Sequence, residues 1–219
     1  MPKKALFIHR SVGENLVSDG GVYELIKERV DLEFSDFNQN TQKLRTVSAS
    51  SKSTLQMPGN DTHPENFAEL FNSKHKSELL DLAQTFDLVV IKSCYPNSDI
   101  KSNEELLQVK KYYQSVFSFF ERHKRKLLLL TSPPLRPTST TPGSASRARE
   151  LATWLSSSDF GSNIGVLDLY DLLADEHNVL KKEFRRLIWL DDHPNRKASR
   201  SIAPVFVSRI KECVDVNDK

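Results

Sequence analysis

The chain has 219 residues, of which 38% are apolar and 27% are charged, and its formal net charge is +2. This length and composition suit one globular α/β domain, so we expect a single domain over residues 1–219. A charge so close to zero gives no strong field for nucleic acid or for a membrane surface, and we expect neither as a partner.

The two cysteines, Cys94 and Cys213, are too few for a disulfide framework in a chain of this size. The first apolar stretch, residues 5–8, is too short for the core of a signal peptide, and no apolar run approaches the length of a membrane span. These features predict two reduced thiols and a cytoplasmic location.

The first half of the chain opens with an apolar strand at residues 5–8, followed directly by a helix. A weaker strand, residues 32–37, alternates in polarity as an edge strand does. Residues 38–62 are rich in Ser, Thr, Asn and Gln and are typical of a long loop. Short helical patterns follow at residues 67–71 and 77–84.

The second half contains three continuous apolar runs, at residues 88–91, 127–130 and 164–169, which are typical of strands buried on both faces. Helical spacing follows them at residues 103–123, 144–155 and 199–214. A loop rich in Pro, Ser and Thr occupies residues 132–146. Pro204 is expected to kink the last helix or to lie in its first turn.

Strands that alternate with helices indicate right-handed βαβ units. We therefore predict a three-layer α/β/α fold, similar to flavodoxin, with a five-stranded parallel sheet. The two long loops should gather at the carboxyl edge of this sheet, where ligands bind in such folds.

Ser11 directly follows the first predicted strand, and Gly13 stands two residues beyond it at the start of a helix. Backbone N–H groups at a helix N-terminus carry a partial positive charge. A hydroxyl beside them can attack a carbonyl while they stabilise the resulting oxyanion. Ser11 is therefore a candidate nucleophile, and the alternative is a simple helix N-cap.

His193 lies near the C-terminus in the segment Asp191-Asp192-His193-Pro194-Asn195, just before the last predicted helix. A nucleophilic serine needs a base within hydrogen-bond reach, and that base needs an acceptor that fixes its tautomer. His193 is the candidate base. Asp191 is preferred as the acceptor for this base, and Asp192 is the alternative acceptor. The alternative interpretation of His193 itself is an exposed loop histidine without a catalytic role.

The order of these pieces resembles that of the SGNH/GDSL hydrolases, which have a serine after the first strand and an Asp and a His together before the last helix. The resemblance spans nearly the whole chain and rests on the order and spacing of short motifs. It implies a three-layer α/β/α fold and an esterase site of Ser11, His193 and Asp191 that needs neither a cofactor nor a metal.

The resemblance also implies two further donors to the oxyanion. Gly59, in Pro58-Gly59-Asn60-Asp61, stands where the family offers a backbone N–H after the second strand. Asn97 is the candidate for the amide donor after the third strand, and Ser93 is its rival.

Two departures from the family pattern are plain. The nucleophile segment reads His9-Arg10-Ser11-Val12 where the family reads Gly-Asp-Ser-Leu, so Arg10 replaces an acid. Leu190 stands three residues before His193, where the family places its acid. Either a neighbouring Asp takes that role after a small shift, or the site works with a Ser–His pair.

Other polar residues near the predicted strand ends have simpler interpretations. His9 is interpreted as structural rather than as a second base, and Cys94 as a buried inert thiol. Lys92 is either a recognition site for a substrate anion or an ordinary strand-end charge. Asp61 and His63 lack the partner cluster that a metal site needs.

The expected function is hydrolysis of a small-molecule or carbohydrate ester, such as an O-acetyl ester, through an acyl-enzyme on Ser11. The first alternative is a binding module on the same fold that has lost activity. The second is a flavodoxin-like binder of phosphate or FMN, which would leave the segment around His193 unexplained.

Overall fold

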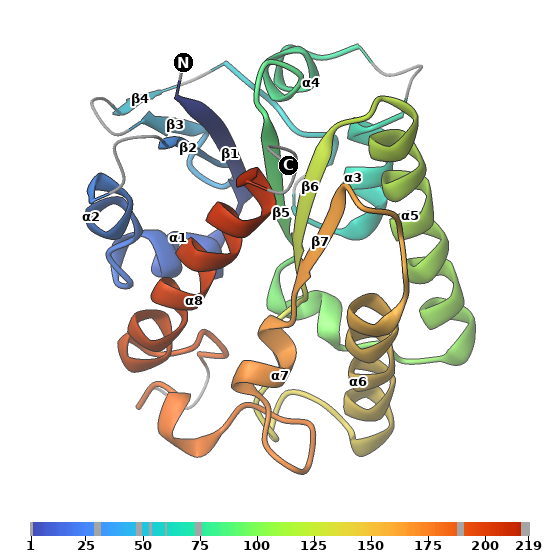
Figure 1. Cartoon of the computed structure of the whole chain (residues 1–219). Helices are drawn as coiled ribbons and strands as arrows, with labels where there is room; N and C mark the ends of the chain where they lie inside the picture. The colour runs from blue at the N-terminus through green and yellow to red at the C-terminus, as the bar shows by residue number, and fades with distance from the viewer. Residues whose placement is uncertain are drawn as a thin grey trace.

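The computed structural model describes residues 2–28, 32–46, 50–52, 54–59, 61–72, 76–187 and 191–215. Over these residues the chain forms a seven-stranded sheet with the strand order β4-β3-β2-β1-β5-β6-β7 (Figure 1). Helices cover both faces of the sheet, so the expected three-layer α/β/α architecture is confirmed.

Five neighbouring strands are parallel, as predicted: β2 (Leu32–Asn38), β1 (Lys3–His9), β5 (Leu88–Lys92), β6 (Lys126–Leu130) and β7 (Ile164–Leu167). The central strands are continuous apolar runs because both of their faces are buried. In β1, the four residues from Ala5 to Ile8 are all 0% exposed. The chain places β2 on one side of β1 and β5 on the other, which makes a topological switch point at the ends of β1 and β5.

Two strands extend the sheet beyond the prediction. β3 (Lys43–Thr46) pairs antiparallel with β2, and β4 (Ser50–Lys52) pairs antiparallel with β3. The interpretation of residues 38–62 as a long loop is therefore wrong, and β2 is an internal strand rather than an edge. The polar β3 pattern, Lys-Leu-Arg-Thr, carries little strand signal by itself, so its pairing with β2 decides its conformation.

One face of the sheet is covered by α1 (Ser11–Ser18), α2 (Val22–Lys27), α7 (Leu169–Leu173) and α8 (Arg196–Asp215). The other face is covered by α3 (Pro64–Leu70), α4 (Glu78–Ala83), α5 (Asn103–Arg122) and α6 (Pro142–Ser157). Figure 1 shows α8 crossing in front of the sheet and α5 and α6 on the opposite side. Two separate apolar clusters result, one under each helical layer.

α5 agrees with the predicted helix at residues 103–123 because apolar side chains that recur every three or four residues face the core, while Leu107 is exposed on the opposite side. The side chain of Ser102 caps the helix by accepting a hydrogen bond from the Glu105 backbone N–H.

Pro204 lies inside α8 and faces solvent. Of the two expectations for this residue, a place in the first turn of the helix is therefore wrong, and a kink stays a prediction. No helix in the described part of the chain combines the length and the apolar character needed to cross a membrane.

Candidate active site

The carboxyl ends of β1 and β5 meet at the switch point of the sheet. Ser11 follows β1 and Cys94 follows β5, and the Ser11 Oγ lies 3.1 Å from the Cys94 Sγ, within hydrogen-bond distance. Ser11 is half-buried and Cys94 is buried. The thiol interpreted from sequence as inert is therefore the direct neighbour of the candidate nucleophile.

Ser11 is the first residue of α1 rather than its N-cap. Arg10 occupies the N-cap position in an extended conformation, and its side chain does not cap the helix. The free N–H groups of the first turn of α1 are therefore close to the Ser11 hydroxyl. This is the arrangement that an oxyanion site after the first strand requires.

His193 is held by Asp191. Its Nδ1 lies 2.6 Å from the Asp191 Oδ1, and its backbone N–H donates to the same oxygen at 3.0 Å. The Arg186 Nη1 donates to the Asp191 Oδ2 at 3.1 Å. Partial burial raises the pKa of Asp191, but the hydrogen bonds from His193 and the charge of Arg186 outweigh burial and leave that pKa below its usual value.

Asp192 has a different partner. Its Oδ1 accepts a hydrogen bond from the Arg136 backbone N–H at 3.3 Å. Of the two carboxylates considered from sequence, Asp191 is the one that contacts the His193 ring. Leu190, the position at which the resemblance places the acid, lies outside the described residues.

Tyr95 connects the histidine to the switch point. Its ring packs edge-on against the His193 ring, with the centroids 4.9 Å apart, and Tyr95 follows Cys94 in the chain. Across the described residues, no hydrogen bond joins the Ser11 Oγ to the His193 ring, because the hydroxyl faces Cys94 instead. The Nε2 of His193 has no hydrogen-bond partner within the same described part.

Gly59 lies in an exposed loop and has a φ of +66°, a conformation that side chains rarely adopt. A Cβ at this position would lie 2.5 Å from the Asn66 Nδ2, so the loop also packs too closely on Asn66 for a larger residue. Asn66 is in turn fixed by Asp61, whose Oδ1 accepts from the Asn66 Nδ2 at 2.8 Å. No described contact joins Gly59 to Ser11.

Asn97 lies in the short 3-10 helix η1 (Tyr95–Ser98) and donates from Nδ2 to the backbone carbonyl of Thr62 at 3.2 Å. This bond ties η1 to the loop that carries Gly59. Ser93, the rival candidate, is fully buried, and its hydroxyl lies 2.8 Å from the Tyr113 OH in the core. Ser93 therefore faces away from the Ser11 edge, which leaves Asn97 as the amide candidate.

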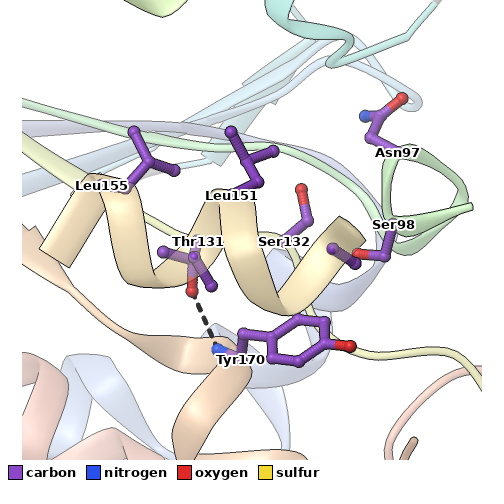
Figure 2. Close-up of a pocket in the computed structure, with 9 residues that line it drawn as sticks. Asn97, Ser98, Thr131, Ser132, Leu151, Leu155 and Tyr170 are labelled. Carbon is purple, nitrogen blue, oxygen red and sulfur yellow. Dashed lines mark hydrogen bonds between the residues drawn. The ribbon is translucent and has the colours of Figure 1, made fainter. Parts of the chain in front are cut away.

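A small cavity extends from Asn97 beneath α6. Figure 2 shows Asn97 and Ser98 at one end of its lining and Leu155 at the other, with Ser132 between them. α6 lines it with apolar side chains, whereas the segment directly after β6 and the helix η1 contribute hydroxyl groups. The Thr131 Oγ1 at its floor accepts a hydrogen bond from the Tyr170 N–H at 2.8 Å.

Lys92 is fully buried beneath the site, so it is neither an exposed strand-end charge nor open to a substrate anion. Its Nζ donates to the Ser93 carbonyl at 2.8 Å. Burial lowers the pKa of Lys92 to about 8.

A cluster of ionisable side chains below the Ser11 turn is not evident from the sequence pattern. His9, Glu14 and Asp36 place their ligand atoms within 4.8 Å of one another. The Arg45 guanidinium bonds to both carboxylates, so an arginine already supplies the positive charge that a metal would bring. The sequence feature that could have indicated this cluster is an acid, Asp36, near the carboxyl end of the second predicted strand.

A scan against protein-family models finds no match to this chain, and a search of curated proteins finds none either. Solved structures are similar over nearly the whole chain. A protein from Bacteroides fragilis NCTC 9343 assigned as an acylhydrolase has a TM-score of 0.59 and 14% identity, with 97% of this chain and 86% of that chain covered.

A GDSL-like lipase from Bacteroides thetaiotaomicron VPI-5482 has a TM-score of 0.56 and 12% identity, covering 97% of this chain and 88% of that one. An acetyl xylan esterase has a TM-score of 0.51 and 18% identity, covering 94% and 98%. At these identities the likeness shows the fold, and it confirms the architecture that the SGNH/GDSL resemblance implies.

Proposed function

We propose that this chain, which shares its fold with GDSL-like esterases, is a serine ester hydrolase. Ser11 is the nucleophile, His193 the general base and Asp191 the residue that orients the base. The N–H groups of Ser11 and Gly59 and the side-chain amide of Asn97 bind the oxyanion.

The observation that carries this proposal is the Asp191–His193 pair, with its 2.6 Å contact, next to Tyr95 at the sheet edge where Ser11 follows β1. The bond at Nδ1 orients the ring and leaves Nε2 for a proton from the nucleophile. The packing of Tyr95 on His193 and the contact of Cys94 with Ser11 link the two halves of the site.

The reaction follows from these positions. The Ser11 hydroxyl turns from Cys94 to the Nε2 of His193, which takes its proton as Oγ attacks the ester carbonyl. The oxyanion is stabilised by the first turn of α1, and the alcohol leaves with the proton from His193. Water then releases the acyl group from Ser11 by the same steps, and no cofactor takes part.

The proposed substrate is a small-molecule or carbohydrate O-acyl ester. One structural neighbour is named an acetyl xylan esterase, and that name supports an acetyl ester of a carbohydrate as the substrate class to test first.

A second candidate function is a binding module without catalysis. The hydrogen-bond distance between Ser11 and Cys94, in place of one between Ser11 and His193, favours it. Hydrogen bonds of catalytic groups are often incomplete before a substrate binds, so this contact is compatible with both functions.

A serine-directed fluorophosphonate probe separates the two functions. We expect the wild-type protein to be labelled at Ser11 and the Ser11→Ala variant to be unlabelled. Cys94→Ala is the matched control, because it removes the thiol within hydrogen-bond distance of the Ser11 hydroxyl and should remain labelled.

Intact-protein mass spectrometry followed by peptide mapping measures the label. A wild-type protein that takes no probe would support the binding module. Labelling that survives in Ser11→Ala but disappears in Cys94→Ala would assign the nucleophile to the thiol and overturn the role of Ser11.

A further inference from the structure

Below the Ser11 turn, hydrogen bonds join the fully buried side chains of His9 and Asp36 to the partly buried side chains of Glu14 and Arg45, and we call these four residues the buried charge network. The Nε2 of His9 lies 2.8 Å from the Asp36 Oδ2, and both side chains are fully buried. Arg45 donates from Nη2 to the same oxygen at 2.7 Å and from Nε to the Asp36 Oδ1 at 3.0 Å.

Arg45 also closes the network on α1. Its Nη1 and Nη2 each donate to a carboxylate oxygen of Glu14 at 2.8 Å. His9 precedes Ser11 by two residues and Glu14 follows it by three, so the network joins the two sides of the Ser11 turn. The residues that join these two sides are Asp36 on β2 and Arg45 on the neighbouring strand β3.

Both carboxylates are held ionised. Burial raises the pKa of Asp36, but hydrogen bonds from His9 and Arg45 outweigh burial and leave that pKa below its usual value. The pKa of Glu14 is lowered in the same way, by hydrogen bonds from Arg45, Ser18 and Asn38 that outweigh its burial. Asp36 is fully buried and Glu14 is partly buried, so breaking one of their bonds would leave a charge incompletely compensated, and the network holds a defined geometry.

The backbone of the turn contacts the same side chains. The Arg10 carbonyl accepts the Glu14 N–H at 3.0 Å and lies 3.2 Å from the His9 Nδ1. A Cβ on Gly13 would lie 2.4 Å from the His9 Cβ, so the first turn of α1 rests directly on the histidine. The side chain of the N-cap residue, Arg10, does not cap α1, so these contacts hold the start of the helix.

We propose that the buried charge network is a positioning device that fixes the Ser11 turn, with Arg45 as the residue that locks its two sides together. Its catalytic consequence rests on the proposed esterase function. The network touches neither the Ser11 hydroxyl nor the His193 ring in the described structure, so it acts on the nucleophile through the backbone.

Arg45→Lys tests this inference. Lysine keeps the positive charge but lacks the planar fork that bonds to Glu14 and Asp36 at once. We expect kcat for a p-nitrophenyl ester to fall at least ~10-fold while KM changes little, because a small displacement of a nucleophile affects the rate more than the binding. Glu14→Gln, which breaks the same link from the other side, should give the same kcat-against-KM split.

Tyr23→Phe is the matched control. Tyr23 donates to the Asp36 Oδ1 at 2.6 Å but does not join the two sides of the turn. The Tyr23→Phe variant removes this partly buried hydrogen bond to Asp36, and we expect its kcat to stay within ~2-fold of the wild type. Equal losses of kcat in Tyr23→Phe and Arg45→Lys would overturn the inference, because the network would then act only through stability.

Amide hydrogen exchange, followed by NMR, gives a readout that does not need catalysis. The Glu14 N–H, which bonds to the Arg10 carbonyl, should exchange at least ~10-fold faster in Arg45→Lys than in Tyr23→Phe. If the wild type takes no fluorophosphonate, the esterase function fails, and exchange alone decides whether the network fixes the turn. Equal exchange in the two variants would overturn the positioning role, whatever the outcome of labelling.

Discussion

At the scale of single residues, the two adjacent carboxylates before His193 differ in what they touch. Asp191 contacts the imidazole Nδ1 and is itself bonded to Arg186, whereas Asp192 accepts from a backbone N–H of Arg136. A carboxylate at Nδ1 fixes the tautomer and stabilises the imidazolium that forms when the base takes a proton. Only Asp191 meets that requirement in the structure.

This difference gives a direct prediction for paired variants. Asp191→Asn should lower kcat about 10³-fold or more, because an amide can hold the ring in the wrong tautomer. Asp192→Asn makes the same carboxylate-to-amide change at the next residue. It should keep kcat within about threefold of the wild type, since Asp192 bonds to the Arg136 backbone N–H and not to the His193 ring. Steady-state kinetics on a chromogenic acetyl ester measures both, and the reverse order of effects would assign the acid to Asp192.

At the scale of secondary-structure elements, α8 carries an unusual residue in its interior. Pro204 cannot donate a hydrogen bond to the carbonyl of Arg200, and its ring crowds that carbonyl. The helix nevertheless runs from Arg196 to Asp215, because its apolar face packs on the sheet through side chains such as Ile202 and Phe206. Tertiary packing here outweighs a strong local preference against helix.

Pro204→Ala should therefore stabilise the protein. The variant gains a backbone hydrogen bond and loses the clash, and the more flexible unfolded chain offsets part of that gain, for a net increase of about 2 kcal/mol in the free energy of unfolding. Val205→Ala is the control on the next exposed position, where only about 0.5 kcal/mol is expected. Urea denaturation measures both; a Pro204→Ala protein no more stable than the wild type would show that α8 bears no strain there.

At the scale of the whole molecule, Lys92 links the stability of the fold to pH. It is fully buried at the end of a central strand, and its pKa falls from 10.5 to about 8 on folding. Between these two pH values the unfolded chain binds a proton that the folded chain does not. The free energy of unfolding contributed by this residue therefore rises as pH increases from about 8 to 10.5, and is lowest below pH 8.

Lys92→Met should flatten this dependence and raise stability at pH 7 by roughly 3 kcal/mol at most, from the linkage of about 1.4 kcal/mol per pKa unit. Lys4→Met, at a half-exposed lysine of β1, is the control and should leave the slope between pH 8 and 10.5 unchanged. Chemical denaturation at a series of pH values measures both slopes. A wild type and a Lys92→Met protein with parallel pH profiles would contradict the burial of a charged group at this position.

Much of this architecture could be predicted from the sequence, because the buried parallel strands are continuous apolar runs and the long helix α5 has a regular apolar spacing. β3 could not be predicted, since its polar residues form a strand only through pairing with β2. The Asp191–His193 contact followed from local spacing, whereas the bonds from Arg45 to Asp36 and Glu14 join three separate elements. Such long-range charge contacts depend on register, which the sequence pattern alone does not determine.

The antiparallel pair at the sheet margin has a consequence for protein engineering. Arg45 on β3 bonds to Glu14 on α1 and to Asp36 on β2. The β3–β4 hairpin therefore cannot be exchanged freely without affecting the parallel core. A chimaera that swaps in the corresponding margin of a structural neighbour would remove the counter-ion of Asp36 and Glu14 unless the donor hairpin also presents a guanidinium at that register. Grafts at this margin should therefore keep residue 45 even where they change everything around it.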